Sequence, residues 1–436
     1  MRVLLIAEAA NPEWTSVPLV GWCQAKAIAN SVDTHLVTQV RNREAILRAG
    51  YREPQDFTAI DSERVAAGVY RFATFLRGGS DRGWTTVTAL ESLSYRYFER
   101  LVWRQFEARL RAGEFDLVHR LTPLSPSMSS YIVGGLQRLG VPFVLGPLNG
   151  GLPWPRGFGA RRWQEGEWLS YLRGAHRLLP SHRATRNGAA AILIGSRITW
   201  QEMPARHHAK CVYMPENGID RARIDPAREP LHLPPLRVVF VGRLVPCKGV
   251  DMLIDAAAPL VRDGSVVVEI IGDGPLRGDL ERQARELHIA AGVTFTGWVE
   301  HALLQNRLRG AHAFAFPSIR DFGGAVVLEA MASGLVPVVV DYGGPPESAA
   351  GDAGLRVPLG SREEIVAGFR THFAELAASP QKLAQFAERA RARAMLFTWD
   401  HKAACLREVY RWVLGQRDKP DFGQPFAPKE SVLSAS

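Results

Sequence analysis

Short apolar runs of four to seven residues, rich in Val, Ile and Phe, alternate along the chain with stretches of helical periodicity. This alternation is typical of parallel strands joined by crossover helices. In the second half we expect strands at LRVVFVG, VVVEIIG, VTFTG, AHAFAFP and VPVVVDYGG, with helices near 249–262, 276–288, 301–309 and 325–333. In the first half the matching runs are VLLIAEA, THLVTQV, FDLVHR, PFVLGP and AAILIGS. Both halves are therefore predicted to be doubly wound α/β domains.

The chain changes character near residues 213–219, YMPENGI, where a strand-like run meets Pro, Asn and Gly. A length of 436 residues with 46% hydrophobic residues suits two domains better than one. We expect a first domain at 1–214, a second at 215–398 and a last helix within 399–416. The tail at 417–436 is rich in Pro, Gly, Ser and Lys, which predicts disorder.

The charge balance and the cysteines limit the class of protein. Lys and Arg number 53 against 44 Asp and Glu, and the resulting charge of +9 favours anionic partners. Nucleic acid is disfavoured because the basic residues form no recognisable binding module. The four cysteines lack zinc or dithiol spacing and indicate reduced thiols in a cytoplasmic protein. The N-terminus suits a buried strand better than a signal peptide, and no apolar run approaches the ~18 to 20 residues of a membrane span.

Ligands of open parallel sheets bind beyond the carboxyl ends of the strands. LRVVFVG runs into GRLVPCKG, which places Gly242, Arg243 and Lys248 at such an end. The guanidinium of Arg243 and the ammonium of Lys248 can together neutralise a diphosphate. The alternative is that both are ordinary surface charges on a solvated loop. VEIIG runs into GDGPL, where Gly272 permits close approach of a ligand or simply a tight turn. The GxGxxG spacing of a dinucleotide site is absent there.

The stretch RDFGGAVVLEAMASG combines a glycine loop with a charged residue on an apolar helix. Gly323 and Gly324 would lie at a helix N-terminus, where amide groups and the helix dipole favour an anion. Glu329 follows one turn later among apolar neighbours. Its carboxylate must therefore face water or accept hydrogen bonds from a bound group such as a ribose, unless it caps a neighbouring loop.

In the first half, His119 is expected at the carboxyl end of the strand FDLVHR. There it can contact a substrate hydroxyl or assist proton movement, although a purely structural histidine is the alternative. The loop LTPLSPS follows, and PFVLGP runs into LNGGLPWP. Residues of this half expected to face a ligand are Gly21, at the start of a helix, and Gly150 and Gly151.

Several common site motifs are missing from the sequence. There is no DxD triplet, no GxxxxGK[ST] loop, no GxSxG elbow and no HExxH pair. Charge neutralisation would therefore fall to Arg, Lys and helix amides. We expect neither a metal site nor a cofactor.

The ordered set GRLVPCKG, GDGPL, TGWV, FGGAVVLEAMASGLVPVV and YGGPPE, together with NGID at 217–220, resembles the donor half of the retaining GT-B glycosyltransferases of family 4. VHRLTPLSP and GPLNGG resemble the acceptor half of one bacterial subgroup of that family. The resemblance covers most of residues 1–415 and is strongest from 215 to 350.

The resemblance implies two Rossmann-like domains that face each other across a cleft, with a last helix that crosses back to the first domain. It also implies a nucleotide sugar held by the second domain and an acceptor held mainly by the first. The catalytic candidates it indicates are Arg243 and Lys248 for the diphosphate, Glu329 for the ribose, and Asp321 and His119 for the transferred sugar. The donor-binding candidates are Gly21, Gly242, Gly272, Phe322, Gly323, Gly324 and Ala325. The acceptor-side candidates are Thr122, Asn149, Gly150 and Gly151.

This sequence departs from the family pattern at two positions. Asp321 stands where the family usually has Glu, and one fewer methylene moves the carboxylate inward by roughly a bond length. The loop after the first strand usually carries a Gly-Gly pair, whereas here SVPLVGW offers only Gly21.

The expected activity is metal-independent, retaining transfer of a sugar from a nucleotide diphosphate sugar to a hydroxyl, in polysaccharide or glycolipid synthesis. A nucleotide-sugar epimerase of the same fold and a degenerate sugar-nucleotide-binding protein are the alternatives. The basic and aromatic segment 160–187 would suit contact with anionic lipid head groups near a lipid-linked acceptor, unless it only packs on its own domain. The expected location is the cytoplasm or the inner face of the membrane.

Overall fold

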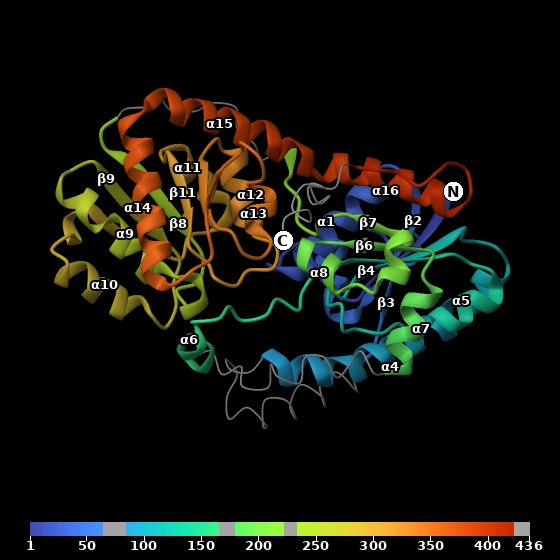
Figure 1. Ribbon diagram of the computed structural model, residues 1–436. Helices are drawn as coiled ribbons and strands as arrows, with labels where there is room; N and C mark the ends of the chain where they lie inside the picture. The colour runs from blue at the N-terminus through green and yellow to red at the C-terminus, as the bar shows by residue number, and fades with distance from the viewer. Residues whose placement is uncertain (64–83, 165–178, 222–232, 423–436) are drawn as a thin grey trace, which may run out of the picture. The chain divides into compact units, whose positions relative to one another are not determined.

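The computed structural model describes residues 1–63, 84–164, 179–221 and 233–422. The chain divides into two compact units (Figure 1). Unit 1 comprises residues 1–151, 169–216 and 400–436, and unit 2 comprises 152–168 and 217–399. Each unit is built on one parallel sheet, so the prediction of two α/β domains is confirmed.

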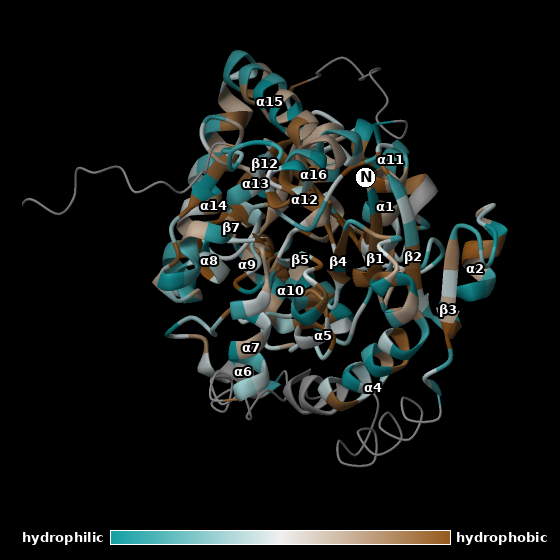
Figure 2. Cartoon of the chain, turned by 90° about the vertical axis from the view of Figure 1, so that its right-hand side faces the viewer, coloured by the Kyte–Doolittle hydropathy of each residue, from teal (hydrophilic) through white to brown (hydrophobic). Residues whose placement is uncertain are grey.

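The sheet of unit 1 has seven strands in the order β3-β2-β1-β4-β5-β6-β7, and all neighbours run parallel. Figure 2 shows apolar residues along its central strands β1 and β4. The strands are almost entirely buried because helices cover the sheet, which explains their continuous apolar runs. Their bounds are β1 Arg2–Ala7, β2 Asp33–Gln39, β3 Phe57–Ile60, β4 Leu117–Thr122, β5 Phe143–Leu148, β6 Ala191–Ile194 and β7 Cys211–Tyr213.

The helices of unit 1 bury apolar side chains against this sheet. The final helix, α16, places Leu406, Val409 and Tyr410 in the same core cluster as Val3 and Leu5 of β1. The helices are α1 Val17–Ala29, α2 Arg43–Arg48, α4 Trp84–Arg111, α5 Val133–Leu139, α7 Pro180–Gly188, α8 Arg197–Glu202 and α16 Trp399–Val413.

The sheet of unit 2 has six parallel strands in the order β10-β9-β8-β11-β12-β13. The strand order reverses between β8 and β11, so the loops that follow these two strands diverge. A crevice at such a switch point is where ligands of this architecture bind. The strand bounds are β8 Leu236–Val241, β9 Val266–Ile271, β10 Val293–Gly297, β11 Ala313–Phe316, β12 Val336–Val340 and β13 Leu355–Val357.

The helices of unit 2 pack in two groups, with α9 against α10 and α14, and α12 against α15. The start of α14 is defined by a capping box, in which the Ser361 side chain accepts from the Glu364 amide and the Glu364 carboxylate accepts from the Ser361 amide. The helices are α6 Gly159–Gln164, α9 Val250–Arg262, α10 Arg277–Glu286, α11 His301–Arg309, α12 Ala325–Ala332, α13 Pro345–Ser348, α14 Arg362–Ala378 and α15 Pro380–Ala394.

Several boundaries differ from the sequence-based expectation. β4 continues three residues beyond His119, and α1 begins at Val17 rather than near Gly21. Residues 152–164 pack with unit 2, although they precede the last two strands of unit 1 in the sequence. Within the described residues, no helix combines the length and apolar character needed to span a membrane.

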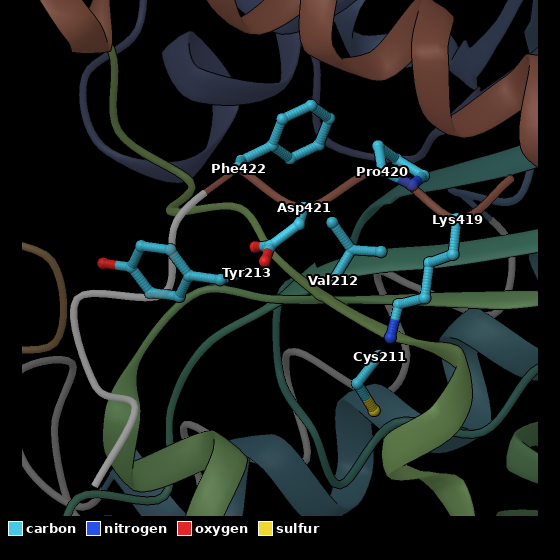
Figure 3. Close-up of a pocket in the computed structure, with 7 residues that line it drawn as sticks. All are labelled: Cys211, Val212, Tyr213, Lys419, Pro420, Asp421 and Phe422. Carbon is cyan, nitrogen blue, oxygen red and sulfur yellow. The ribbon is translucent and has the colours of Figure 1, made fainter. Parts of the chain in front are cut away.

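Part of the tail that we expected to be disordered is ordered against unit 1. Lys419, Pro420, Asp421 and Phe422 run beside β7 and line a pocket of about 210 Å³ together with Cys211, Val212 and Tyr213 (Figure 3). Phe422 packs against the core cluster that contains Val212. The rest of the expected disorder, residues 423–436, lies outside the described residues.

Candidate functional site

The loops that follow β8 and β11 are joined at the switch point of unit 2. The carbonyl oxygen of Cys247 accepts hydrogen bonds from the Ile319 amide at 3.0 Å and the Ser318 hydroxyl at 3.2 Å. A Cβ placed on Gly249 would lie 2.4 Å from the carbonyl oxygen of Pro317, so only glycine permits this approach. The predicted cation loop and the predicted glycine loop are therefore neighbours in space.

Lys248 and Asp321 form an ion pair at this junction. The Lys248 ammonium donates to one carboxylate oxygen of Asp321, and the other oxygen accepts from the Gly324 amide at 2.9 Å. The ammonium also lies 5.0 Å from the centre of the Phe316 ring. The two charged side chains remain 21% and 17% exposed, so the pair is partly accessible to solvent.

The N-terminus of α12 faces the same junction. Gly324 precedes the helix in the left-handed conformation, with φ 60°, and a Cβ there would lie 3.0 Å from Pro345. Phe322, Gly323 and Ala325 are half-exposed around it. Glu329, one turn into the helix, is half-buried on a face whose neighbours are mostly buried apolar residues. The first turns of α12 thus carry both the amides of its N-terminus and the carboxylate of Glu329.

The glycine loop after β12 packs backbone on backbone against the loop after β11. The Gly344 amide donates to the carbonyl oxygen of Asp321 at 3.1 Å. A Cβ would lie 2.2 Å from that oxygen if placed on Gly343, and 2.0 Å from the carbonyl oxygen of Phe322 if placed on Gly344. The glycines of YGGPPE therefore have a packing role that supports the loop carrying Asp321.

Gly242 and Gly272 are packed against each other. A Cβ on Gly272 would lie 2.0 Å from the carbonyl oxygen of Gly242, so the packing of the two loops requires glycine here. A ligand contact of Gly272 stays a prediction. Arg243, next in sequence, is exposed. Within the part of the chain that the structure describes, its guanidinium has no hydrogen-bond or ion-pair partner, so it can bind a ligand without losing an internal contact.

One contributor to the site was missed by the sequence analysis. The Arg320 guanidinium, beside Asp321, lies 5.0 Å from the centre of the Trp154 ring and 5.6 Å from that of the Phe322 ring. Trp154 falls within 1–214, the range expected for the first domain, but it packs in unit 2. The run LPWPRGFG, with its Pro and Gly content, was the available signal that the chain leaves the sheet there.

His119 differs from the expectation of a residue at a strand end. It lies inside β4 and is fully buried. Its Nε2 donates to the carbonyl oxygen of Gly146 at 2.7 Å, and the Tyr410 hydroxyl then donates to Nδ1 at 2.6 Å. Burial lowers the pKa of His119 to about 4, so the ring stays neutral. Contact with a sugar would require one of these hydrogen bonds to break.

Three other first-half candidates are engaged in internal contacts of unit 1. The Thr122 hydroxyl bonds to both the amide and the carbonyl oxygen of Ala9, at 3.1 and 3.2 Å. The Asn149 side-chain amide lies 2.8 Å from each carboxylate oxygen of Glu216. Gly21 is buried inside α1, where a Cβ would lie 2.2 Å from the carbonyl oxygen of Ala9. The expectation that Gly21 starts a helix was wrong because the helix begins four residues earlier.

The glycine pair after Asn149 remains accessible. Gly150 and Gly151 are half-exposed and have φ values of 142° and 76°. A Cβ would lie 3.1 Å from Pro126 at the first position and 3.3 Å from Glu202 at the second. Among the described residues, no group of three or more His, Cys, Asp or Glu side chains is placed to hold a metal ion.

The site loops lie in a region with known relatives. Residues 223–393 match the family described as glycosyl transferases group 1. The D-inositol 3-phosphate glycosyltransferase of Gordonia bronchialis is 33% identical over 212 residues, which cover 46% of this chain and 45% of that protein. The glycogen synthase of Deinococcus radiodurans is 35% identical over 172 residues, covering 39% and 37%. The matches thus span less than half the length of these curated relatives.

Solved structures match nearly the whole chain. A glycosyltransferase from Rickettsia africae has a TM-score of 0.60 at 12% identity and covers 95% of this chain and 99% of its own. Anabaena HepE in complex with UDP has a TM-score of 0.59 at 16% identity, covering 94% and 99%. At these identities the likeness shows the fold, which is GT-B. The findings together support a group 1 glycosyltransferase.

Proposed function

We propose that this protein transfers a sugar from a nucleotide diphosphate sugar to a hydroxyl acceptor, with retention at the anomeric carbon. The observation that carries the proposal is the cluster at the switch point of unit 2. There the ammonium of Lys248 pairs with Asp321, whose other carboxylate oxygen accepts from the Gly324 amide at the N-terminus of α12. The exposed Arg243 precedes Lys248 in the loop after β8, and both loops lie in a region that matches a glycosyltransferase family. This is the set of cationic and amide donors that a leaving diphosphate requires.

The chemical work assigned to these groups is electrostatic. As the bond from the anomeric carbon to the phosphate oxygen breaks, negative charge grows on the diphosphate. Arg243, Lys248 and the first amides of α12 stabilise that charge, and losing one such donor costs roughly 3 kcal/mol of barrier lowering. The acceptor oxygen attacks the same face of the anomeric carbon, and its proton passes to the departing phosphate oxygen.

The remaining contacts follow the resemblance of the site loops to the family. Glu329 accepts from the ribose hydroxyls, and Asp321 with the amides of Phe322, Gly323 and Gly324 contacts the transferred sugar. The acceptor is held by unit 1, with the accessible pair of glycines after Asn149 as its best-exposed candidate element. His119 stays a prediction, since both of its ring nitrogens are bonded within unit 1.

The relatives suggest which donor to test first. Anabaena HepE was solved with UDP, with UDP and glucose, and with UDP-glucose. UDP-sugars are therefore the first donors to test, ahead of GDP-, ADP- and dTDP-sugars. A role in polysaccharide or glycolipid synthesis is proposed on the same ground, since other structural neighbours act in lipopolysaccharide biosynthesis by their titles. The relatives are transferases, which disfavours the epimerase and binding-protein alternatives.

The proposal is tested by binding and turnover together. A donor present at about 100 times its Kd should stabilise the wild-type protein by about 2.7 kcal/mol through mass action. Alanine at Arg243, Lys248 or Glu329 should reduce turnover by about 100-fold or more. Arg389→Ala is the matched control, because its guanidinium makes an exposed ion pair with Asp352 on the surface of the same unit. Near wild-type turnover in all three site variants would refute the assignment. Unchanged turnover in excess EDTA is expected for metal-independent transfer.

A membrane contact is also proposed, on residues other than those first considered. Half of segment 160–187, residues 165–178, lies outside the described residues. On α4, however, Leu93 is 59% exposed and Arg96, Arg100 and Arg104 follow it along one helix face. Among the described residues Arg100 and Arg104 have no carboxylate partner, and Arg96 lies over the half-exposed ring of Tyr131. This basic face with apolar members suits an anionic lipid surface, at the cytoplasmic side of a membrane.

Vesicle flotation tests this contact. Wild-type protein should float with vesicles of phosphatidylglycerol at low salt and much less at high salt, because the attraction is screened. A double variant, Arg100→Glu with Arg104→Glu, should stay at the bottom of the gradient, whereas Arg389→Ala should float like wild type. Absence of wild-type flotation at both salt concentrations would remove the membrane proposal.

A further inference from the structure

Residues 152–164, which we call the bridging segment, leave unit 1 after β5 and pack within unit 2. Leu152 and Phe158 are buried, at 2% and 5% exposure, and Phe158 belongs to the core cluster of unit 2. The segment ends in α6, which contacts the short helical turn at Pro246–Lys248 (Figure 1). The bridging segment is therefore part of the packing of unit 2, and its two ends contact different loops of that unit.

The first end of the bridging segment holds the loop after β11. The Arg320 guanidinium contacts the rings of both Trp154 and Phe322, and its Nε donates to the carbonyl oxygen of Leu152 at 3.3 Å. Arg320 and Phe322 flank Asp321 in the sequence. The stack therefore fixes the backbone on both sides of the carboxylate assigned to the transferred sugar.

The same end also holds the loop after β12. The Tyr342 hydroxyl donates to the carbonyl oxygen of Pro153 at 2.7 Å. The position of a Cβ on Gly343 would lie 3.1 Å from the Leu152 side chain. Because the glycine pair that follows Tyr342 packs directly on the Asp321 loop, this contact supports that loop from a second direction.

The second end of the bridging segment holds the loop after β8. One Nη atom of Arg161 donates to the carbonyl oxygen of Pro246 at 2.7 Å, and the other pairs with Asp251 at 2.6 Å. Arg161 is only 14% exposed and lies 5.5 Å from the centre of the Phe158 ring. Pro246 stands two residues before Lys248, so this contact restrains the loop assigned to the diphosphate.

We infer that the bridging segment positions the donor site in two separable parts. Trp154 and Arg320 are positioning residues for recognition of the transferred sugar, and Arg161 is a positioning residue for recognition of the diphosphate. The physical reason is that binding groups on loops lose affinity when they are displaced by less than 1 Å, and each contact lies within two residues of such a group. This inference rests on the proposed function.

The test compares two ligands across four variants. Calorimetry gives the Kd of a nucleoside diphosphate and of its nucleotide sugar for wild type, Trp154→Ala, Trp154→Phe, Arg320→Gln and Arg161→Gln. Trp154→Ala and Arg320→Gln should weaken the nucleotide sugar by about tenfold, the order expected for one desolvated cation–π stack, and the diphosphate by less than about threefold. Trp154→Phe, which keeps a ring, should recover most of the loss. Arg161→Gln should weaken both ligands equally.

Steady-state kinetics give the second measurement. In Trp154→Ala, KM for the donor should rise with KM for the acceptor unchanged, while Arg389→Ala should match wild type in all constants. Equal weakening of both ligands in Trp154→Ala and Arg320→Gln would show a merely structural role and overturn the inference. Wild-type affinities in both variants would overturn it too. If wild type itself binds no nucleotide sugar, the proposed function fails first, and the inference fails with it.

Discussion

The ion pair between Lys248 and Asp321 leads to a prediction of opposite effects on two ligands. A diphosphate that engages Lys248 competes with the Asp321 carboxylate for one ammonium and must also approach a negative charge. Asp321→Asn removes that charge while its side-chain oxygen can still accept from the Gly324 amide. We therefore expect tighter binding of a nucleoside diphosphate. We also expect a smaller ratio of nucleotide-sugar affinity to diphosphate affinity, and slower transfer, because Asp321 is assigned to the sugar.

The size of the effect follows from the exposure of the pair. Two unit charges in contact at an effective dielectric of about 20 attract by roughly 4 to 5 kcal/mol. Both side chains keep about a fifth of their surface exposed, at 21% and 17%, so water and salt screen the pair strongly. Fully exposed ion pairs contribute about 0.2 to 1 kcal/mol, and we expect about 1 to 2 kcal/mol for this more buried pair. Asp321→Asn should therefore tighten diphosphate binding by about 5- to 30-fold.

The assay is calorimetric titration of UDP, GDP, ADP and dTDP into wild type, Asp321→Asn, Lys248→Gln and the double variant. Lys248→Gln should weaken the bound diphosphate, and the double variant should show non-additivity of about 1 to 2 kcal/mol. Asp352→Asn is the matched control. It removes one carboxylate that pairs with Arg389 on the same unit, so an unspecific effect of net charge would appear there too.

Two results would refute this reasoning. One is a diphosphate affinity in Asp321→Asn that is unchanged or as weak as in Lys248→Gln. The other is full additivity of the two substitutions, which would mean that the two side chains do not interact in solution. Asp321→Glu adds a useful comparison, because it lengthens the side chain by one methylene with the charge retained. We expect its diphosphate affinity to stay near that of wild type.

Three further predictions concern stability. The pKa of His119 is lowered to about 4 in the folded protein, so the unfolded chain takes up a proton first as the pH falls. The free energy of unfolding should therefore decrease as the pH drops from about 6.5 to 4, by at most about 1.4 kcal/mol per pH unit. Urea unfolding of His119→Gln should show a smaller decrease over this range, and an equal decrease in both proteins would contradict the prediction. Gly272→Ala forces a Cβ to 2.0 Å from a carbonyl oxygen and should lower the free energy of unfolding by about 2 to 4 kcal/mol, whereas Gly278→Ala, which meets nothing within 4 Å on α10, should raise it by up to about 1 kcal/mol. Asn149→Asp places a second carboxylate beside that of Glu216. The free energy of unfolding, measured with urea, should fall by about 3 kcal/mol at pH 8 and by less at pH 5. An equal loss at both pH values would count against this prediction.

Most of the strands could be predicted because their signals are local. Runs such as LRVVFVG and VVVEIIG are fully apolar since both faces of a parallel sheet are covered, and the structure places β8 and β9 there. The helices after them begin within one residue of the expected positions, at Val250 and Arg277. The short edge strands β3 and β13 were missed, because three or four residues carry too little pattern.

The candidate site could be predicted only in part. The loops of unit 2 that carry Arg243, Lys248 and Asp321 do follow strands, as expected. Which of these groups touch was not predictable, since Lys248 and Asp321 are 73 residues apart in the chain. In unit 1 the same kind of reasoning could not foresee the partner of His119, because Tyr410 is 291 residues away.

The sequence by itself determined the two parallel α/β domains, most of their strands, and the loops at which a ligand site is expected. These depend on periodicity and on turn residues within short windows. Only the tertiary structure decided that Lys248 is paired with Asp321, that Thr122 and Asn149 bond within unit 1, and that Trp154 stacks in unit 2. The physical reason is that a side chain's partner depends on which distant segments the sheet order brings together, and no local pattern encodes that distance.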